Sequence, residues 1–254
     1  MPEHGGRTGL RLVLEGAVIL VSILAAFFLE GWRNDRELGQ EVRLELVSVG
    51  KELERNRNIV LAELGAIDRI IAGSEGVLAQ LEADPGTSLV SVADSLAWLA
   101  AMWGPTLDPS LGAVQALISS GRLAQIEDSE LRLGLAGLRD MFTDAAQEQQ
   151  LALQVSAEQL YPRIMRSPDL PALRRVSREF VTVRQEAGLS PQEQMAGGRM
   201  PTYRDVAFPN AVDVRGILNL KMIWYEAAVA ELRPLLPHLE RLIDLVEREA
   251  GVAP

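Results

Sequence analysis

The chain has 254 residues, of which 48% are hydrophobic, and its formal net charge is −10 at pH 7. This length and apolar content allow one large or two small domains with a substantial core. The negative charge argues against a nucleic-acid-binding protein, because such proteins need clustered cations, and the lack of cysteine excludes disulfides, thiolate metal sites and cysteine nucleophiles.

Residues 1–8 form a polar tail, and residues 9–32 follow as the only stretch suited to hydrocarbon. The sequence from Leu12 to Leu29 is apolar except for Glu15 and Ser22. A helix of this stretch covers roughly 27 Å, at about 1.5 Å per residue, which is close to the thickness of a bilayer core. The sequence therefore predicts a transmembrane helix over residues 9–32.

The boundary of this span agrees with a membrane interface, since it ends in the aromatic Trp32 and the charged Arg33. A cleaved secretory signal peptide is the alternative. Residues 27–29, however, continue the apolar run where a cleavage region should become polar. We therefore favour an anchor that is retained.

Four residues of the span are candidate contacts to other membrane helices. Arg11 and Glu15 are four positions apart, so they share a helix face and can pair near the interface or instead extend towards the headgroups. Ser22 and Ala26 form a small-xxx-small step that allows close helix approach. The span has no histidine, cysteine or methionine, so we expect no haem and no other cofactor in it.

A long amphipathic helix is predicted directly after the span. Large apolar residues recur between residues 38 and 81 at about 3.6 positions per step, with Asn56 and Ser74 filling two steps. Glycines near residue 73 suggest a kink or break. The sequence Asp84-Pro85-Gly86 predicts the end of this helix.

A helical corner is predicted in the middle of the chain. Gly121 ends one helix, Leu123 fills the turn and Asp128 caps the next helix. Arg122 and Arg132 offer an alternative reading of this corner as a binding notch.

Proline divides the later chain. The helix that begins after Asp128 is limited or bent by Pro162, and residues 166–213 read as an irregular connector, with a short basic helix possible at 173–183. In the last helix, apolar residues between 218 and 246 step alternately by four and three, which favours coiled-coil packing. Pro234 and Pro237 predict a kinked helix or two collinear pieces.

The predicted fold is all-α, with one N-terminal transmembrane helix followed by an elongated antiparallel helical bundle with coiled-coil-like long helices at 33–254. Arg132, Trp224 and Tyr225 are the expected contacts to a partner outside the membrane. Exposed apolar surface on two sides of the last helix would favour membership of a complex, whereas a self-complementary stripe would favour a homo-oligomer.

Three segments of the chain resemble a family of uncharacterised bacterial single-span membrane proteins known only as a domain of unknown function. They are the run from Leu29 to Arg43, the central segment from Ala116 to Leu138 and the terminal segment from Val214 to Glu247. The resemblance implies an N-terminal anchor and a helical domain, and it brings no assigned activity.

Catalytic chemistry finds little support in the sequence. His4 and His238 have no serine, acid pair or second histidine at a useful spacing, and no glycine-rich phosphate loop is present. Glu52 and Glu54 are expected on solvated faces, and the acids at 127–130 are explained by a helix N-terminus. We therefore expect a protein that is not an enzyme and holds no metal.

Two functional classes remain. The first is a structural or accessory subunit that packs on a larger membrane complex of respiratory, photosynthetic or transport type. The second is a homo-oligomeric membrane-anchored sensor or tether, which the short N-terminal tail makes less attractive because it leaves no room for an output domain. We expect a bacterial inner-membrane location with the N-terminus in the cytoplasm and the helical domain in the periplasm. Basic residues normally lie on the cytoplasmic side of a span, but arginines flank this span on both sides. The orientation therefore depends on the acidic residues after the span, which contribute little to that rule.

Overall fold

The computed structural model describes residues 5–83, 89–90, 101–102, 104–165, 171, 174–175, 178, 182, 185–189, 206–207 and 211–251. Side chains are described for these residues except 5–19, 21, 35, 89–90, 164, 206–207 and 211–213.

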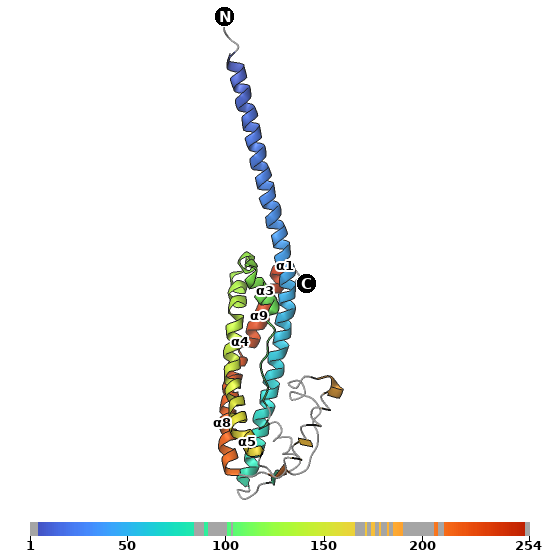
Figure 1. Ribbon diagram of the computed structural model, residues 1–254, viewed down its shortest axis with the longest axis vertical. Helices are drawn as coiled ribbons and strands as arrows, with labels where there is room; N and C mark the ends of the chain where they lie inside the picture. Colours follow the sequence, from blue (N-terminus) through green and yellow to red (C-terminus); the bar gives the residue numbers. More distant parts are fainter. Residues whose placement is uncertain are drawn as a thin grey trace.

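Helix α1 (Gly5–Ala83) dominates the molecule with 79 residues, or about 118 Å at 1.5 Å per residue. Its first half projects beyond the other elements, and its second half packs against them (Figure 1). The helix runs without interruption, so of the kink or break predicted near residue 73 the break is absent. Because Gly73 and Ser74 are buried, packing stabilises the helix where its glycines weaken it. Its end at Ala83 directly precedes the predicted stop at 84–86.

The remaining described elements are short or medium in length. In chain order they are β1 (Leu89–Val90), α3 (Gly112–Ser119), the 3₁₀ helix η1 (Arg122–Gln125), α4 (Ser129–Val155), the π-helix η2 (Ser156–Leu160), α5 (Tyr161–Ile164), β2 (Val206–Ala207), α8 (Ala211–Leu232) and α9 (Leu235–Ala250). The two strands pair antiparallel over two residues each. Within the predicted basic helix 173–183, the described residues 174–175, 178 and 182 are helical.

The helices form an elongated antiparallel bundle, which confirms the predicted all-α class. Helix α4 runs in the same direction as α1, and α8 followed by α9 returns along both (Figure 1). Helix α1 packs against α8 and α9, and α4 packs against the same two helices. Within the described residues, no helix is both long and apolar enough to cross a membrane.

The buried face of α1 follows the predicted stripe down to Val60, and beyond it alternate steps fall one residue earlier while the steps between them remain as predicted. Leu46, Leu53 and Val60 are buried as predicted. Beyond that point Glu63 takes the core position expected for Leu64, which is only half-buried. The shift places a carboxyl group in the middle of the bundle.

Proline sets both irregularities of the long helices. Pro162 lies in the first turn of α5, and its ring cannot coexist with a regular α-helical turn before it, so η2 adopts the wider π conformation. Pro234 is the N-cap of α9 and separates it from α8, which agrees with the predicted division of the last helix into two pieces.

Candidate functional site

The predicted helical corner is present at the end of the bundle nearest the projecting half of α1. Gly121 has a φ of 75°, which ends α3 in a left-handed turn, and Ile126 is buried beneath the turn. The Asp128 carboxylate accepts hydrogen bonds from the backbone N–H groups of Glu130 (2.8 Å) and Leu131 (3.1 Å). The N-cap role of Asp128 is therefore confirmed.

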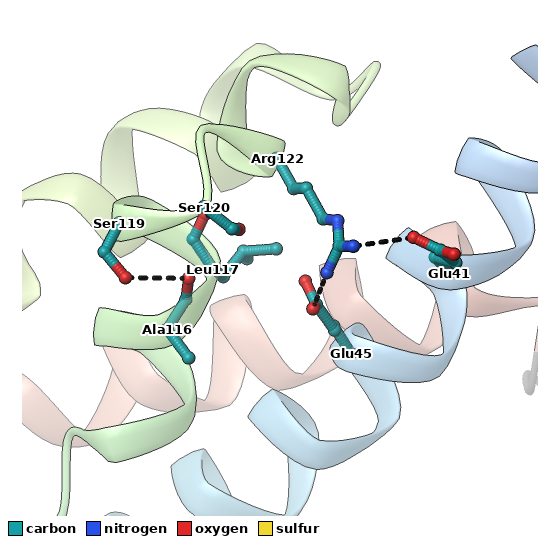
Figure 2. A network of polar contacts seen from close by, with 7 residues as sticks. All are labelled: Glu41, Glu45, Ala116, Leu117, Ser119, Ser120 and Arg122. Carbon is teal, nitrogen blue, oxygen red and sulfur yellow. Dashed lines mark hydrogen bonds and ion pairs between the residues drawn. The ribbon is translucent and has the colours of Figure 1, made fainter.

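Both arginines of the predicted notch are engaged in this corner. Figure 2 shows the Arg122 guanidinium reaching from the corner to Glu41 (2.6 Å) and Glu45 on α1. Arg132 donates to the backbone carbonyls of Ile126 and Glu127. The Arg122 ion pairs hold the corner against α1, and the Arg132 hydrogen bonds close the turn. Both arginines therefore have a structural role here.

A more distinctive site lies farther along the bundle, where residues 104–111 cross the helices without regular structure. We call residues 104–111 the strap. At its start, Gly104 lies directly on the core, because a Cβ atom there would come within 2.1 Å of the Leu153 side chain and 2.8 Å of the Tyr225 hydroxyl. A larger residue at this position would therefore have to displace the Leu153 side chain, and glycine allows the close approach without that displacement.

Polar side chains from α1 hold the far end of the strap. Asn56 accepts a hydrogen bond from Ser110 N–H (2.8 Å) and donates one to the Ser110 carbonyl (2.6 Å). Glu52 accepts from the Ser110 hydroxyl and from the N–H groups of Ala113 and Val114, each at 3.0 Å.

These contacts overturn one local expectation, that for Glu52, and give Asn56 a role. Glu52 does not lie on a solvated face, since its carboxylate takes the place of an N-cap for α3, whose own N-cap residue Leu111 offers no side-chain acceptor. Asn56 is buried at its predicted step of the stripe, and its amide pairs with the backbone of the strap at Ser110. Neither role is visible in the sequence, because the partners are 54 to 62 residues apart.

The middle of the strap is held by Gln149 of α4. Its Oε1 accepts from Leu107 N–H (3.0 Å), and its Nε2 donates to Glu63 Oε1 (2.8 Å). Gln149 and Glu63 are both buried, so one amide joins the strap, α4 and α1 inside the core. Their sequence separation of 86 residues hides this link from sequence analysis.

The segment just before the strap is held by α8 and α5. Lys221, fully buried, donates to the carbonyl of Ala101 and lies 5.5 Å from the ring centroid of Tyr225. The Tyr161 hydroxyl donates to the carbonyl of Met102 (3.1 Å). Helices α1, α4, α5 and α8 therefore each contribute a polar side chain that holds residues 101–102 or 104–114.

Burial perturbs the ionisable groups of this site. The pKa of Glu63 rises from 4.5 to about 7 because burial disfavours the charged form, although the hydrogen bond from Gln149 acts in the opposite direction. Burial lowers the pKa of Lys221 from 10.5 to about 7. It also raises the pKa of Tyr225, with smaller contributions from Glu63 and Tyr161.

A groove of about 460 Å³ opens between the strap and α4. Its floor and walls include Leu107, Pro109, Leu111, Phe142, Ala146 and Arg139. Among the described residues no group of three acidic or histidine side chains is placed to hold a metal ion.

The predicted contact residues differ in where the structure places them and in how exposed they are. Arg11 and Glu15 lie outside the residues whose side chains are described. Ser22 and Ala26 are exposed on the projecting half of α1, and Trp224 is half-buried against the core. Tyr225 is fully buried between the helices, so it is a core residue and not the outer contact that was expected, because helical packing turned its face inwards.

Comparisons with known proteins add no identity. No protein-family model matches the chain, and neither a curated protein nor a solved structure is significantly similar to it. The family resemblance described from the sequence therefore stays a prediction.

Proposed function

We propose that the protein is a non-catalytic, membrane-anchored accessory subunit, whose N-terminal span at 9–32 inserts in the bilayer and whose helical bundle packs on a larger membrane protein complex. The anchor, the partner complex and the bacterial inner-membrane location are parts of this proposal.

The observation that carries it is the exposure of the projecting half of α1. Every described side chain from residue 20 to 34 is exposed. The large apolar ones are Leu20, Ile23, Leu24, Phe27, Phe28, Leu29 and Trp32, at 48% to 77% exposure. At about 100° per residue they occupy roughly 240° of the helix circumference.

Such a wide apolar surface favours lipid over a single protein partner. A helix that packs on one neighbour needs an apolar stripe only somewhat more than about 100° wide. In water the exposed side chains would be unfavourable by about 25 cal/mol per Å² of apolar surface. A bilayer covers all sides of the helix at once.

The proposed membrane boundary lies close to the bundle. Trp32 is exposed and the Arg36 guanidinium stacks on its ring at 4.9 Å, while Arg33 pairs with Glu37 at 2.8 Å. Among the described side chains of α1, the first that is buried belongs to Val42. Ten residues of helix span about 15 Å, so the bundle would stand directly above the headgroups.

The outer face of α8 provides the surface for a partner in this proposal. Leu220 and Ile223 are 43% and 56% exposed, while Leu218 and Tyr225 on the opposite face are buried. Apolar residues on two sides of this helix favour membership of a complex.

The test begins with gentle detergent extraction of the protein from its own membranes, followed by the mass and composition of the purified species. We expect a stoichiometric set of integral membrane proteins that is lost in Ala26→Leu or Ile223→Asp. Leu133→Asp is the matched control, because Leu133 is an exposed leucine on α4. A protein that purifies alone, or a partner set unchanged in both test variants, would refute the accessory role.

Anchoring and orientation need separate measurements. We expect the full chain to stay with the membrane fraction after carbonate extraction at high pH, and release into the supernatant would refute the anchor. A reporter fused at residue 254 should be active in the periplasm, and activity confined to the cytoplasm would reverse the orientation.

A homo-oligomeric sensor or tether is the second candidate. It is favoured by the buried ionisable groups and the groove at the strap, which a purely structural bundle does not require. Purification of a homo-oligomer without other proteins would support it.

A further inference from the structure

One buried link connects the strap to an ionisable group. Gln149 accepts from Leu107 N–H with its oxygen and donates to Glu63 Oε1 with its nitrogen. The second carboxyl oxygen, Glu63 Oε2, is buried and has no hydrogen-bond partner among the described residues, and the same is true of the Tyr225 hydroxyl. A strap held through such a group responds to the charge on that group.

We propose that Glu63, Gln149 and Leu107 form a proton-sensitive latch, in which neutral Glu63 keeps the strap closed and ionised Glu63 favours a state with the middle of the strap released. In the released state the middle of the strap separates from Gln149 and α1 far enough for water to reach the carboxylate. The groove between the strap and α4 widens as a result.

The physical reason is the shortage of donors around Glu63. A buried carboxylate is stable only when several hydrogen bonds or a cation replace its water. Among the described residues, the one hydrogen bond to Glu63 comes from the uncharged amide of Gln149. Ionisation therefore favours any local opening that restores hydration, and the pKa of about 7 places this transition near neutral pH.

Among the described residues, helices α8 and α5 contribute further charged or titratable groups to this region. Helix α8 contributes Tyr225 and Lys221, with the lysine directed to the Ala101 carbonyl. Tyr161 of α5 contributes to the raised pKa of the Tyr225 hydroxyl. On α9, His238 has a buried Nε2 atom without a partner among the described residues, so it serves as a control position.

The strap contains its own reference position. Ser110 N–H is held by Asn56, whose amide does not titrate, whereas Leu107 N–H is held through Glu63 and Gln149. Raising the pH should therefore release Leu107 before Ser110.

The experiment is residue-level hydrogen exchange on the full-length chain in detergent micelles, from about pH 5 to about pH 8, corrected for the intrinsic chemical exchange rate. A group whose pKa is 4.5 when hydrated and about 7 when buried predicts a roughly 50- to 100-fold rise in the opening constant at Leu107, which levels off above pH 7. Ser110 should change little over the same range.

Two variants identify the titrating group. Glu63→Gln keeps the size of the side chain and should make the protection of Leu107 independent of pH, while His238→Gln should leave the rise unchanged. A flat profile in the wild type, or a rise that persists in Glu63→Gln, would overturn the proposal. This outcome is independent of the membrane anchor, because extraction and hydrogen exchange measure different parts of the chain.

Discussion

Replacing Glu52 tests whether a side chain of α1 caps α3 across the bundle. Glu52→Ala removes three hydrogen bonds to a carboxylate, from the Ser110 hydroxyl and from the N–H groups of Ala113 and Val114. Each such bond contributes about 1.5–3 kcal/mol in isolation, but bonds that share one half-buried carboxylate do not add fully.

We expect Glu52→Ala to lower the free energy of unfolding by about 3 kcal/mol, since the substitution combines a lost N-cap of about 1–2 kcal/mol with the loss of the strap contact. Glu52→Gln should cost about half as much, because the amide keeps one acceptor oxygen. The matched control is Glu54→Ala, two residues away on α1 and exposed, which should stay within about 0.5 kcal/mol of the wild type.

The assay is urea unfolding of the full-length chain in detergent micelles, followed by far-ultraviolet circular dichroism, with equal m values as the condition for comparing variants. Hydrogen exchange at Ala113 and Val114 would localise the effect to the first turn of α3. Equal stabilities for Glu52→Ala and Glu54→Ala would show that the three contacts contribute nothing net and would refute the cap.

Three further predictions follow from the packing and the charges. Gly134→Ala should destabilise the protein by about 1–2 kcal/mol despite its gain in helix propensity, because the new methyl group would lie 2.4 Å from the Leu242 side chain. Gly137→Ala on the same helix has open space around it and should stabilise the protein by about 0.5–1 kcal/mol. Equal changes in Tm for the two variants would contradict the close packing at Gly134. From pH 4.5 to pH 7, Glu63 binds more protons in the folded than in the unfolded state, so the free energy of unfolding should fall by about 2.5 kcal/mol relative to Glu63→Gln. Urea unfolding at each pH measures this change, and parallel curves for the two proteins would contradict the raised pKa. Arg122→Gln should cost about 1 kcal/mol at low salt and less at high salt, and a loss that does not depend on salt would rule out the ion pairs with α1.

Local patterns predicted the helices well, because the residues that decide them are neighbours in the chain. The 3.6-residue period before Val60, the Asp128 cap and the turn at Gly121 all depend on contacts within a few positions. The break expected near residue 73 failed for the opposite reason. Burial of that segment against other helices outweighs the weak helix propensity of its glycines.

The strap and its latch depended on tertiary structure alone. Glu63 and Leu64 are neighbours in the sequence, and both lie near the edge of the buried face of α1. A small rotation of the helix about its axis decides which of the two enters the core. Its partner Gln149 lies 86 residues later, and the Glu52 cap acts on residues about 60 positions away. By itself the sequence determined an all-helical chain, its main stops and one stretch of apolar character, since these follow from local periodicity. Only the packing of α1, α4 and α8 decided which polar groups are buried together, because desolvation and hydrogen bonding between distant residues arise when the helices meet.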